Sequence, residues 1–142
     1  MSAEPTIRVA TPEDIPAVLE VWAQARSAAA VTPDSAESVS LLLERSGGDG
    51  LLVAESDGQI VGVLVAAWDG WRGNMYRLAV LPSHRRRGIA RRLVEAGHAH
   101  LRAKGARRVT ALVAHEEDEA TALWRSTGYD LDDQIARFVR NL

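Results

Sequence analysis

The chain has 142 residues, of which 46% are hydrophobic and 25% are charged, as is usual for one soluble globular domain. It contains no cysteine, which excludes disulfide scaffolds, thiol nucleophiles, cysteine-bearing zinc sites and iron–sulfur clusters. The formal net charge of −2 gives no chain-wide attraction to polyanions, so we expect neither nucleic acid nor a membrane as a partner.

The first part of the chain predicts one strand and two helices. Thr6–Ala10 alternates like a short strand, and Thr11 then caps a helix whose apolar face includes Ile15 and Trp22. A second helix is expected over Ser35–Arg45, with Asp34 as its N-terminal cap.

The middle of the chain changes to a strand pattern. Leu51–Glu55 and Gln59–Trp68 are rich in β-branched and aliphatic residues, and Ser56-Asp57-Gly58 between them predicts a tight hairpin. Met75–Leu81 predicts a third strand, which Pro82 ends. We expect these three antiparallel strands to form the centre of a sheet.

The last part predicts a helix, a strand, a helix and a strand. Their expected ranges are Gly88–Ala103, Arg107–Ala114, Glu116–Thr127 and Ile135–Arg140. In the first of these helices, we expect one stripe to face the core, namely Ile89, Leu93, Ala96, Gly97, His100 and Leu101. The order β-α-α-β-β-β-α-β-α-β predicts a single α/β (α+β) domain over residues 1–142, a mixed sheet flanked by helices, with at least one parallel strand pair.

Two further features concern location and charge. The N-terminus lacks the basic start and apolar run of a secretory signal, and the longest apolar stretch, Ile60–Trp68, is too short to cross a bilayer. We therefore expect a cytoplasmic protein. Nine basic residues and one acid lie between His84 and Arg108, whereas seven acids and one base lie between His115 and Asp133.

The segment Leu78–Ala90 carries the strongest functional signal, because it joins a strand end, a basic turn and a helix start. A helix N-terminus offers free N–H groups and a positive dipole end, and so favours an anion. Gly88 and Ala90 allow close approach, and three arginines raise the potential, which points to a phosphate-bearing ligand. No GxGxxG or GxxxxGK[ST] motif supports a dinucleotide fold or a Walker-type site.

Three motifs resemble those of the GNAT superfamily of N-acetyltransferases. Arg85–Ala90 matches the R/Q-x-x-G-x-G/A signature, Arg77–Pro82 is similar to the strand before it, and Ala120–Tyr129 is similar to a later helix. Three motifs in this order and spacing make a specific signal, although they cover only about residues 77 to 90 and 120 to 129.

The resemblance implies an acetyl-CoA-dependent enzyme that transfers an acetyl group directly to a primary amine of a small molecule or a peptide terminus. The amine acceptor would be its partner. Members are often dimers, so a homodimer is one possibility, and the sequence leaves the oligomeric state open. The resemblance also implies that the strand splays from its neighbour at a bulge and binds pantetheine, while the turn binds pyrophosphate. The matching residues are Leu78, Ala79 and Val80 on the strand and Arg85, Arg86, Arg87, Gly88, Ile89 and Ala90 in the turn.

The sequence departs from the family pattern at the positions for proton transfer. Trp124 stands where many members have a tyrosine thought to protonate the leaving thiolate, and an indole N–H is no practical acid. Trp124 is interpreted as a cofactor contact or as a core residue. Asn74 and Leu112 occupy the two positions at which relatives carry a glutamate base. Tyr76 is therefore the catalytic candidate, with a packed strand aromatic as the alternative, and His115 is a second candidate base.

Other residues are candidates for the acceptor side. Acidic loop residues would attract a cationic amine, and tryptophans would form pocket walls. They are Asp69, Asp130, Asp132, Asp133, Trp22, Trp68 and Trp71. No metal site is expected, because the histidines and carboxylates lack ligand spacing.

Two other functions remain open. The missing acid and base positions suggest a non-catalytic CoA-binding module that regulates a partner. The basic run His84–Arg92 suggests a nucleic-acid-binding domain, although this run has no interleaved aromatic residues.

Overall fold

The computed structural model describes residues 4–25, 34–45, 48–113 and 118–142. These residues form one five-stranded mixed sheet in the order β1-β2-β3-β4-β5, flanked by helices, which confirms the expected fold class. The strands are β1 (Thr6–Val9), β2 (Leu51–Ser56), β3 (Gln59–Trp68), β4 (Gly73–Val80) and β5 (Val109–Ala111). The helices are α1 (Ile15–Ala25), α2 (Ala36–Glu44), α3 (Ile89–Lys104) and α4 (Asp118–Ser126). No helix in the described ranges has the length and apolar character that a membrane span needs.

Strand directions follow the expected connections. Neighbouring strands from β1 to β4 are antiparallel, whereas β4 and β5 are parallel and are joined by α3 as a crossover. The β2–β3 hairpin turns at Asp57 and Gly58, which have φ values of 52° and 79°, as the Asp-Gly signal predicts.

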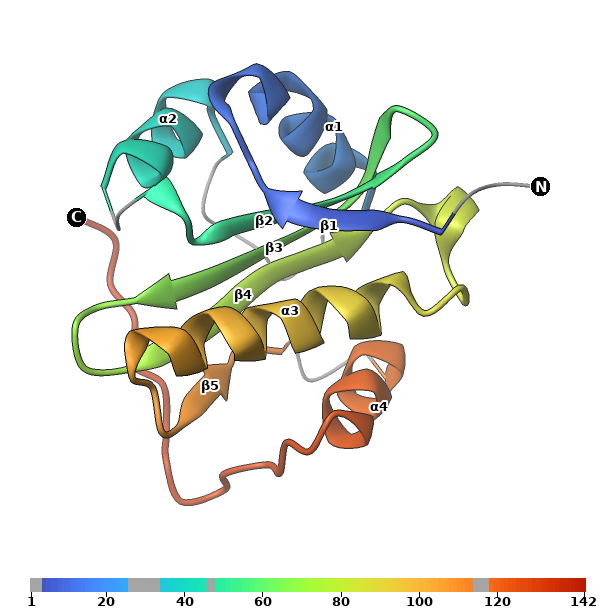
Figure 1. The fold of residues 1–142 in the computed structure, drawn as a ribbon. Helices are drawn as coiled ribbons and strands as arrows, with labels where there is room; N and C mark the ends of the chain where they lie inside the picture. Colours follow the sequence, from blue (N-terminus) through green and yellow to red (C-terminus); the bar gives the residue numbers. More distant parts are fainter. Residues whose placement is uncertain (1–3, 26–33, 46–47, 114–117) are drawn as a thin grey trace.

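The sheet lies between two layers of helices. Figure 1 shows α1 and α2 over one face of the sheet, and α3 and α4 over the other. Gly97 lets α3 approach β4 closely, because a Cβ atom there would lie 2.5 Å from the Met75 side chain. The buried residues of α3 are Ile89, Leu93, Val94, Gly97 and Leu101. Of the expected stripe, His100 instead pairs with Asp49 at the helix edge, with an Nε2–Oδ1 distance of 3.7 Å.

Three predicted elements need correction. The final strand over Ile135–Arg140 is wrong: this segment has no strand pairing, and Ile135 and Phe138 are 72% and 93% exposed. The strand predicted over Arg107–Ala114 is only Val109–Ala111 in the described residues. The cap of α2 is Ser35, whose Oγ accepts the N–H of Ser38, whereas Asp34 pairs with Arg77 of β4.

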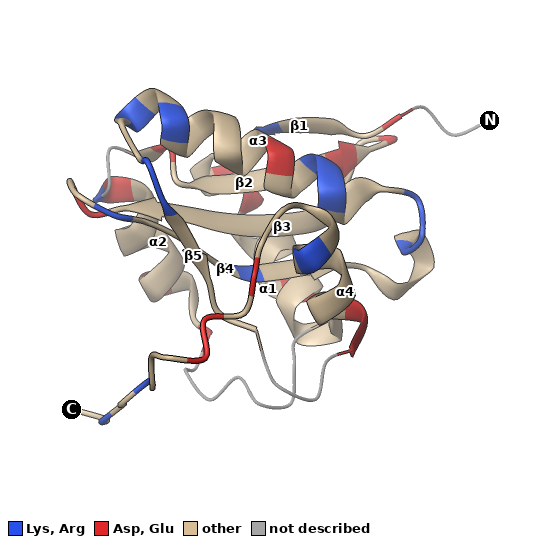
Figure 2. Ribbon diagram, turned by 90° about the horizontal axis from the view of Figure 1, so that it is seen from below, with Lys and Arg blue, Asp and Glu red and all other residues tan. Residues whose placement is uncertain are grey.

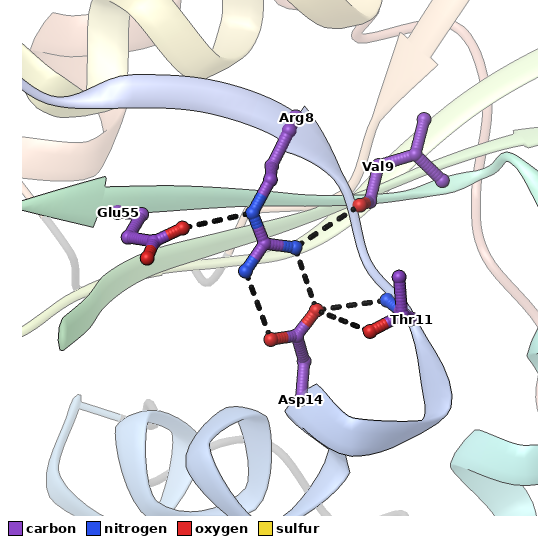
Figure 3. A network of polar contacts seen from close by, with 5 residues as sticks. All are labelled: Arg8, Val9, Thr11, Asp14 and Glu55. Carbon is purple, nitrogen blue, oxygen red and sulfur yellow. Dashed lines mark hydrogen bonds and ion pairs between the residues drawn. The ribbon is translucent and has the colours of Figure 1, made fainter. Parts of the chain in front are cut away.

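A polar network fixes the first strand to the rest of the sheet (Figure 3). The Arg8 guanidinium donates two hydrogen bonds to Asp14, at 2.7 and 3.0 Å, and one to Glu55 at 2.9 Å. The same Asp14 carboxylate accepts the N–H of Thr11 at 2.8 Å, which caps the turn before α1. β1, this turn and β2 are thereby joined through the Arg8 guanidinium, which bonds to both Asp14 and Glu55.

The variant Asp14→Asn is expected to lower the free energy of unfolding at pH 7 by about 1–3 kcal/mol, because it weakens charge-assisted hydrogen bonds. The bonds from Arg8 lower the pKa of Asp14 from 3.8 to about 2. Since the folded pKa lies below the unfolded one, this stabilisation is present above about pH 4 and is lost as the pH falls toward 2.

Urea unfolding from pH 7 to pH 2 measures this effect, with Glu13→Gln at the exposed neighbouring position as the control. A difference between Asp14→Asn and the unmodified protein that stayed constant down to pH 2 would contradict the assigned role.

Candidate functional site

β4 carries a bulge at its centre. The register with β3 passes from Val65 opposite Tyr76 to Val63 opposite Ala79, so Arg77 and Leu78 both lie opposite Leu64. Arg77 has a φ of 57°, a left-handed conformation that is uncommon for a residue other than glycine. The resemblance implied a bulge at this strand, and the structure confirms it.

Contacts with Trp22 and Asp34 hold the bulge. The Trp22 indole N–H donates to the carbonyl oxygen of Arg77 at 3.0 Å, and the Arg77 guanidinium lies 5.2 Å from the ring centroid. The guanidinium also forms an ion pair with Asp34. Trp22 is only 5% exposed, so it fixes the backbone of β4 rather than forming an open wall for the acceptor.

β4 and β5 separate next to this bulge. Their parallel pairing runs from Gly73 opposite Val109 to Met75 opposite Ala111, and the N–H of Leu112 donates to Met75 at 3.4 Å. Within the described residues, Tyr76–Val80 has no partner strand on this side. The backbone of Leu78, Ala79 and Val80 therefore borders an opening in which an extended ligand can bind as a strand does.

The turn after β4 leads into a helix whose N-terminus has no side-chain cap. Pro82–His84 forms one 3-10 turn, and Gly88 is the N-cap of α3 with a φ of 76°. Gly88 has no side chain to accept a bond, and the carbonyl of Gly88 accepts the N–H of Arg92 at 3.1 Å. The first N–H groups of α3, at Ile89 and Ala90, therefore have no acceptor within the helix. Apart from its chain neighbours and the backbone of α3, nothing lies within 4 Å of a Cβ atom placed at Gly88, so the space at that position is open.

The turn before α3 carries three arginines, and Figure 2 shows its ribbon in the blue of basic residues. Arg85 donates to the carbonyl oxygen of Val80 at 3.3 Å, and Arg86 lies 3.5 Å from Glu119 of α4 in an exposed ion pair. Arg87 is exposed. These arginines raise the positive potential around the N–H groups at the start of α3.

Trp124 is buried between α4 and the sheet. It is 6% exposed, and its ring meets the Tyr129 ring edge-on at a centroid distance of 4.9 Å. The Tyr129 hydroxyl lies 2.8 Å from Nε2 of His98 and 3.6 Å from the sulfur of Met75. Burial raises the pKa of Tyr129 to about 12 and lowers that of His98. Core packing accounts for these side chains, and a contact of Trp124 with a cofactor stays a prediction.

Tyr76 lies immediately before the bulge. Met75 contacts α3, and side chains alternate along a strand, so Tyr76 is on the face covered by α1. Burial raises the pKa of Tyr76, so at neutral pH this side chain is a neutral phenol, a group that is able to donate a hydrogen bond.

The other candidate residues are dispersed. Asp69 accepts the N–H groups of Trp71 and Arg72, at 2.8 and 2.6 Å, and so stabilises the β3–β4 turn. Trp68 and Trp71 line a cavity at the C-terminal end of α3, and Trp22 is not part of that lining. Asp130, Asp132 and Asp133 are exposed residues after α4, and Asp132 lies 3.9 Å from Arg108.

Neither family position for a base holds a carboxylate. Asn74 pairs with Ala67 and Thr110 within the sheet, and Leu112 is 53% exposed. His115 lies outside the described residues. Among the described residues, no group of three or more histidines and carboxylates is arranged to hold a metal ion.

Sequence reasoning missed the residues that shape the opening. The left-handed conformation of Arg77 has no sequence signal, because arginine rarely adopts it. The Trp22–Arg77 contact joins residues 55 positions apart, which no local pattern detects.

Comparisons with known proteins agree with this geometry. Residues 16–129 match the model of the acetyltransferase (GNAT) family, and the chain therefore belongs to this family. An acetyltransferase of Sodalis glossinidius is 32% identical over 94 residues, which cover 66% of this chain and 66% of that protein. The match thus spans just under two thirds of the length of this relative.

Solved structures show the same fold. The ribosomal-protein-alanine N-acetyltransferase of Brucella melitensis is 28% identical with a TM-score of 0.73, covering 87% of this chain and 83% of that chain. The PaiA N-acetyltransferase of Thermoplasma acidophilum, solved in complex with coenzyme A, is 17% identical with a TM-score of 0.80 and 92% coverage of each chain. At that identity, the second likeness shows the fold alone.

Proposed function

We propose that this protein is an acetyl-CoA-dependent N-acetyltransferase that transfers the acetyl group directly to a primary amine of a small molecule or a peptide terminus. One observation carries the proposal: α3 starts at Gly88 without a side-chain cap, one turn after a strand whose edge beyond Met75 has no partner strand among the described residues. Family membership and the relatives named as acetyltransferases support it.

The residues fit the coenzyme in two places. The N–H groups of Ile89 and Ala90, with the open space at Gly88, suit a diphosphate, because a helix start attracts anions and glycine permits close contact. Arg85, Arg86 and Arg87 add positive charge there. The free edge of β4 from Leu78 to Val80 suits the amide-bearing pantetheine arm.

The chemistry needs little from reactive side chains. Bound acetyl-CoA supplies an activated thioester, and transfer forms an amide C–N bond, breaks the C–S bond and releases one amine proton. The bulge at Arg77 and Leu78 aims backbone groups out of the β3–β4 ladder, and we propose that they orient the reacting carbonyl. The two positions at which relatives carry a glutamate base hold Asn74 and Leu112. We therefore propose that solvent removes the amine proton.

Tyr76 is proposed to position the amine from the face covered by α1. Tyr76→Phe is expected to lower kcat/KM for the amine about tenfold, the value of one lost hydrogen bond, with the acetyl-CoA dissociation constant changed less than about twofold. Because Tyr76 is protonated at neutral pH, the pH–rate profile of the Tyr76→Phe variant is expected to have the same shape as that of the unmodified enzyme.

Steady-state kinetics over pH 6–10 measure this effect. An unchanged kcat/KM would remove Tyr76 from the site, and a profile that lost an inflection in the variant would show that Tyr76 acts as a base.

Two assays test the proposed function. Acetyl-CoA at about 100 times its dissociation constant is expected to add about 2.7 kcal/mol to the free energy of unfolding. Release of free thiol is then measured across a panel of small primary amines and peptides. No stabilisation by acetyl-CoA would overturn the proposal. Stabilisation without thiol release from any amine would favour the non-catalytic CoA-binding module.

A further inference from the structure

A second cavity lies at the opposite end of α3 from Gly88. Its volume is about 760 Å³, and it is formed where the β3–β4 turn meets the connection from α3 to β5. The 16 residues of α3 separate it from the proposed diphosphate site by about 24 Å, at 1.5 Å per residue. It is therefore separate from that site, and its lining includes none of the residues Tyr76–Val80 that border the opening beside the bulge.

The walls of this cavity are basic. They include Arg72, Lys104, Arg107 and Arg108, and no acidic residue is part of the described lining. Figure 2 shows basic residues at the end of α3 and along the connection to β5. The sequence run from His84 to Arg108 is thus divided by the fold into two basic surfaces, one at each end of the helix.

Nearby acids offset only part of this charge. Lys104 pairs with Asp49 at 2.9 Å, and Arg108, whose side chain is 87% exposed, lies 3.9 Å from Asp132. The Asp69 carboxylate accepts two backbone N–H groups of the turn. Arg102 and Lys104 lie in the last turn of α3 and offset its negative dipole end. Arg72 and Arg107 are further exposed cations in the lining of the cavity.

Two tryptophans stand among these cations. Trp71 is 77% exposed at the tip of the β3–β4 turn, where Asp69 fixes its backbone. The Arg72 guanidinium lies 4.8 Å from the centroid of the Trp71 ring, and Trp68 adds a half-buried aromatic wall. An exposed indole beside guanidinium groups is a platform on which a planar base can stack while its phosphate binds the cations.

We propose that this cavity binds the base and phosphate of a nucleotide, either free or within a single-stranded nucleic acid. A cationic amine would be repelled by the basic walls, so the cavity does not suit the acetyl acceptor. An acidic peptide would satisfy the charges but would leave the exposed indole without a stacking partner. The expectation of no nucleic-acid partner depended on the net charge and on the absence of aromatics from His84–Arg92, and the fold supplies Trp68 and Trp71 from another segment.

Fluorescence anisotropy of the full chain with fluorescein-labelled oligothymidylate of eight nucleotides tests the proposal, with uridine monophosphate as an unlabelled competitor. Saturating coenzyme A keeps the other end of α3 occupied. We expect binding at 50 mM salt that weakens at 200 mM. Trp71→Ala is expected to weaken it at least about fivefold, the lower limit for one stacked base. Arg107→Ala with Arg108→Ala is expected to reduce the salt dependence.

The matched control is Phe138→Ala with Arg125→Ala, an exposed aromatic residue and an exposed arginine outside the cavity. Circular dichroism melting checks that every variant folds. Displacement by uridine monophosphate supports a free nucleotide, and its failure with retained oligothymidylate binding supports a nucleic-acid strand. The proposal is overturned by no binding at 50 mM salt, by equal loss in the control variant, or by equally tight binding of polyglutamate.

Discussion

Gly88→Ala is expected to weaken acetyl-CoA binding about 10- to 100-fold, while the variant still folds. Apart from chain neighbours and the backbone of α3, nothing lies within 4 Å of a Cβ atom at this position, and we assign the open space that it would enter to the diphosphate. Because residue 88 has a left-handed φ of 76°, alanine there adds a strain of about 1–2 kcal/mol to the folded state of the variant. Titration calorimetry gives the affinity, and thermal unfolding without ligand gives the strain.

Gly58→Ala is the matched control. Gly58 has a φ of 79° and open space around its Cβ position, but it lies in the β2–β3 hairpin. It should show a similar loss of stability with unchanged acetyl-CoA affinity. If Gly88→Ala bound acetyl-CoA as tightly as Gly58→Ala, the diphosphate would not contact this turn.

Arg77→Val is expected to raise the acetyl-CoA dissociation constant about 10- to 100-fold, whereas Arg77→Gly is expected to change it less than about fivefold. Both variants lose the ion pair with Asp34 and the contact with the Trp22 ring. Only glycine keeps the φ of 57° without strain, because a β-branched side chain is disfavoured there. Valine therefore favours regular pairing of β4 with β3, which moves Leu78 and Ala79 to other positions.

Equilibrium binding and urea unfolding of the two variants separate these effects. Both should lose comparable contact energy, so the difference in affinity reports the backbone conformation. Equal affinities in Arg77→Val and Arg77→Gly would show that the bulge is not needed for coenzyme binding.

Local signals in the sequence predicted most of the fold. The Asp57-Gly58 pair predicts the hairpin because both residues adopt a positive φ there. Gly105 ends α3 with a φ of 111°, as a C-terminal glycine is expected to do. The parallel pair β4–β5 follows from the crossover helix between the two strands.

Long-range contacts account for what was not predicted. The alternation of Ile135–Arg140 is compatible with a strand, but a strand also needs a ladder partner, and none pairs with it among the described residues. Trp22 shows an apolar helical spacing that predicts a core residue, yet its indole N–H also bonds to the bulge on β4. Trp68 and Trp71 line the same cavity as Arg107 only because the fold brings the β3–β4 turn next to the connection from α3 to β5.

A crystal structure of the protein with coenzyme A bound tests the central claim most directly. We predict diphosphate oxygens within about 3 Å of the backbone N–H groups of Gly88, Ile89 or Ala90, and the pantetheine arm beside Leu78–Val80 on the free edge of β4. A coenzyme bound elsewhere, with this turn empty or filled by the side chains of Arg85, Arg86 or Arg87, would contradict the account.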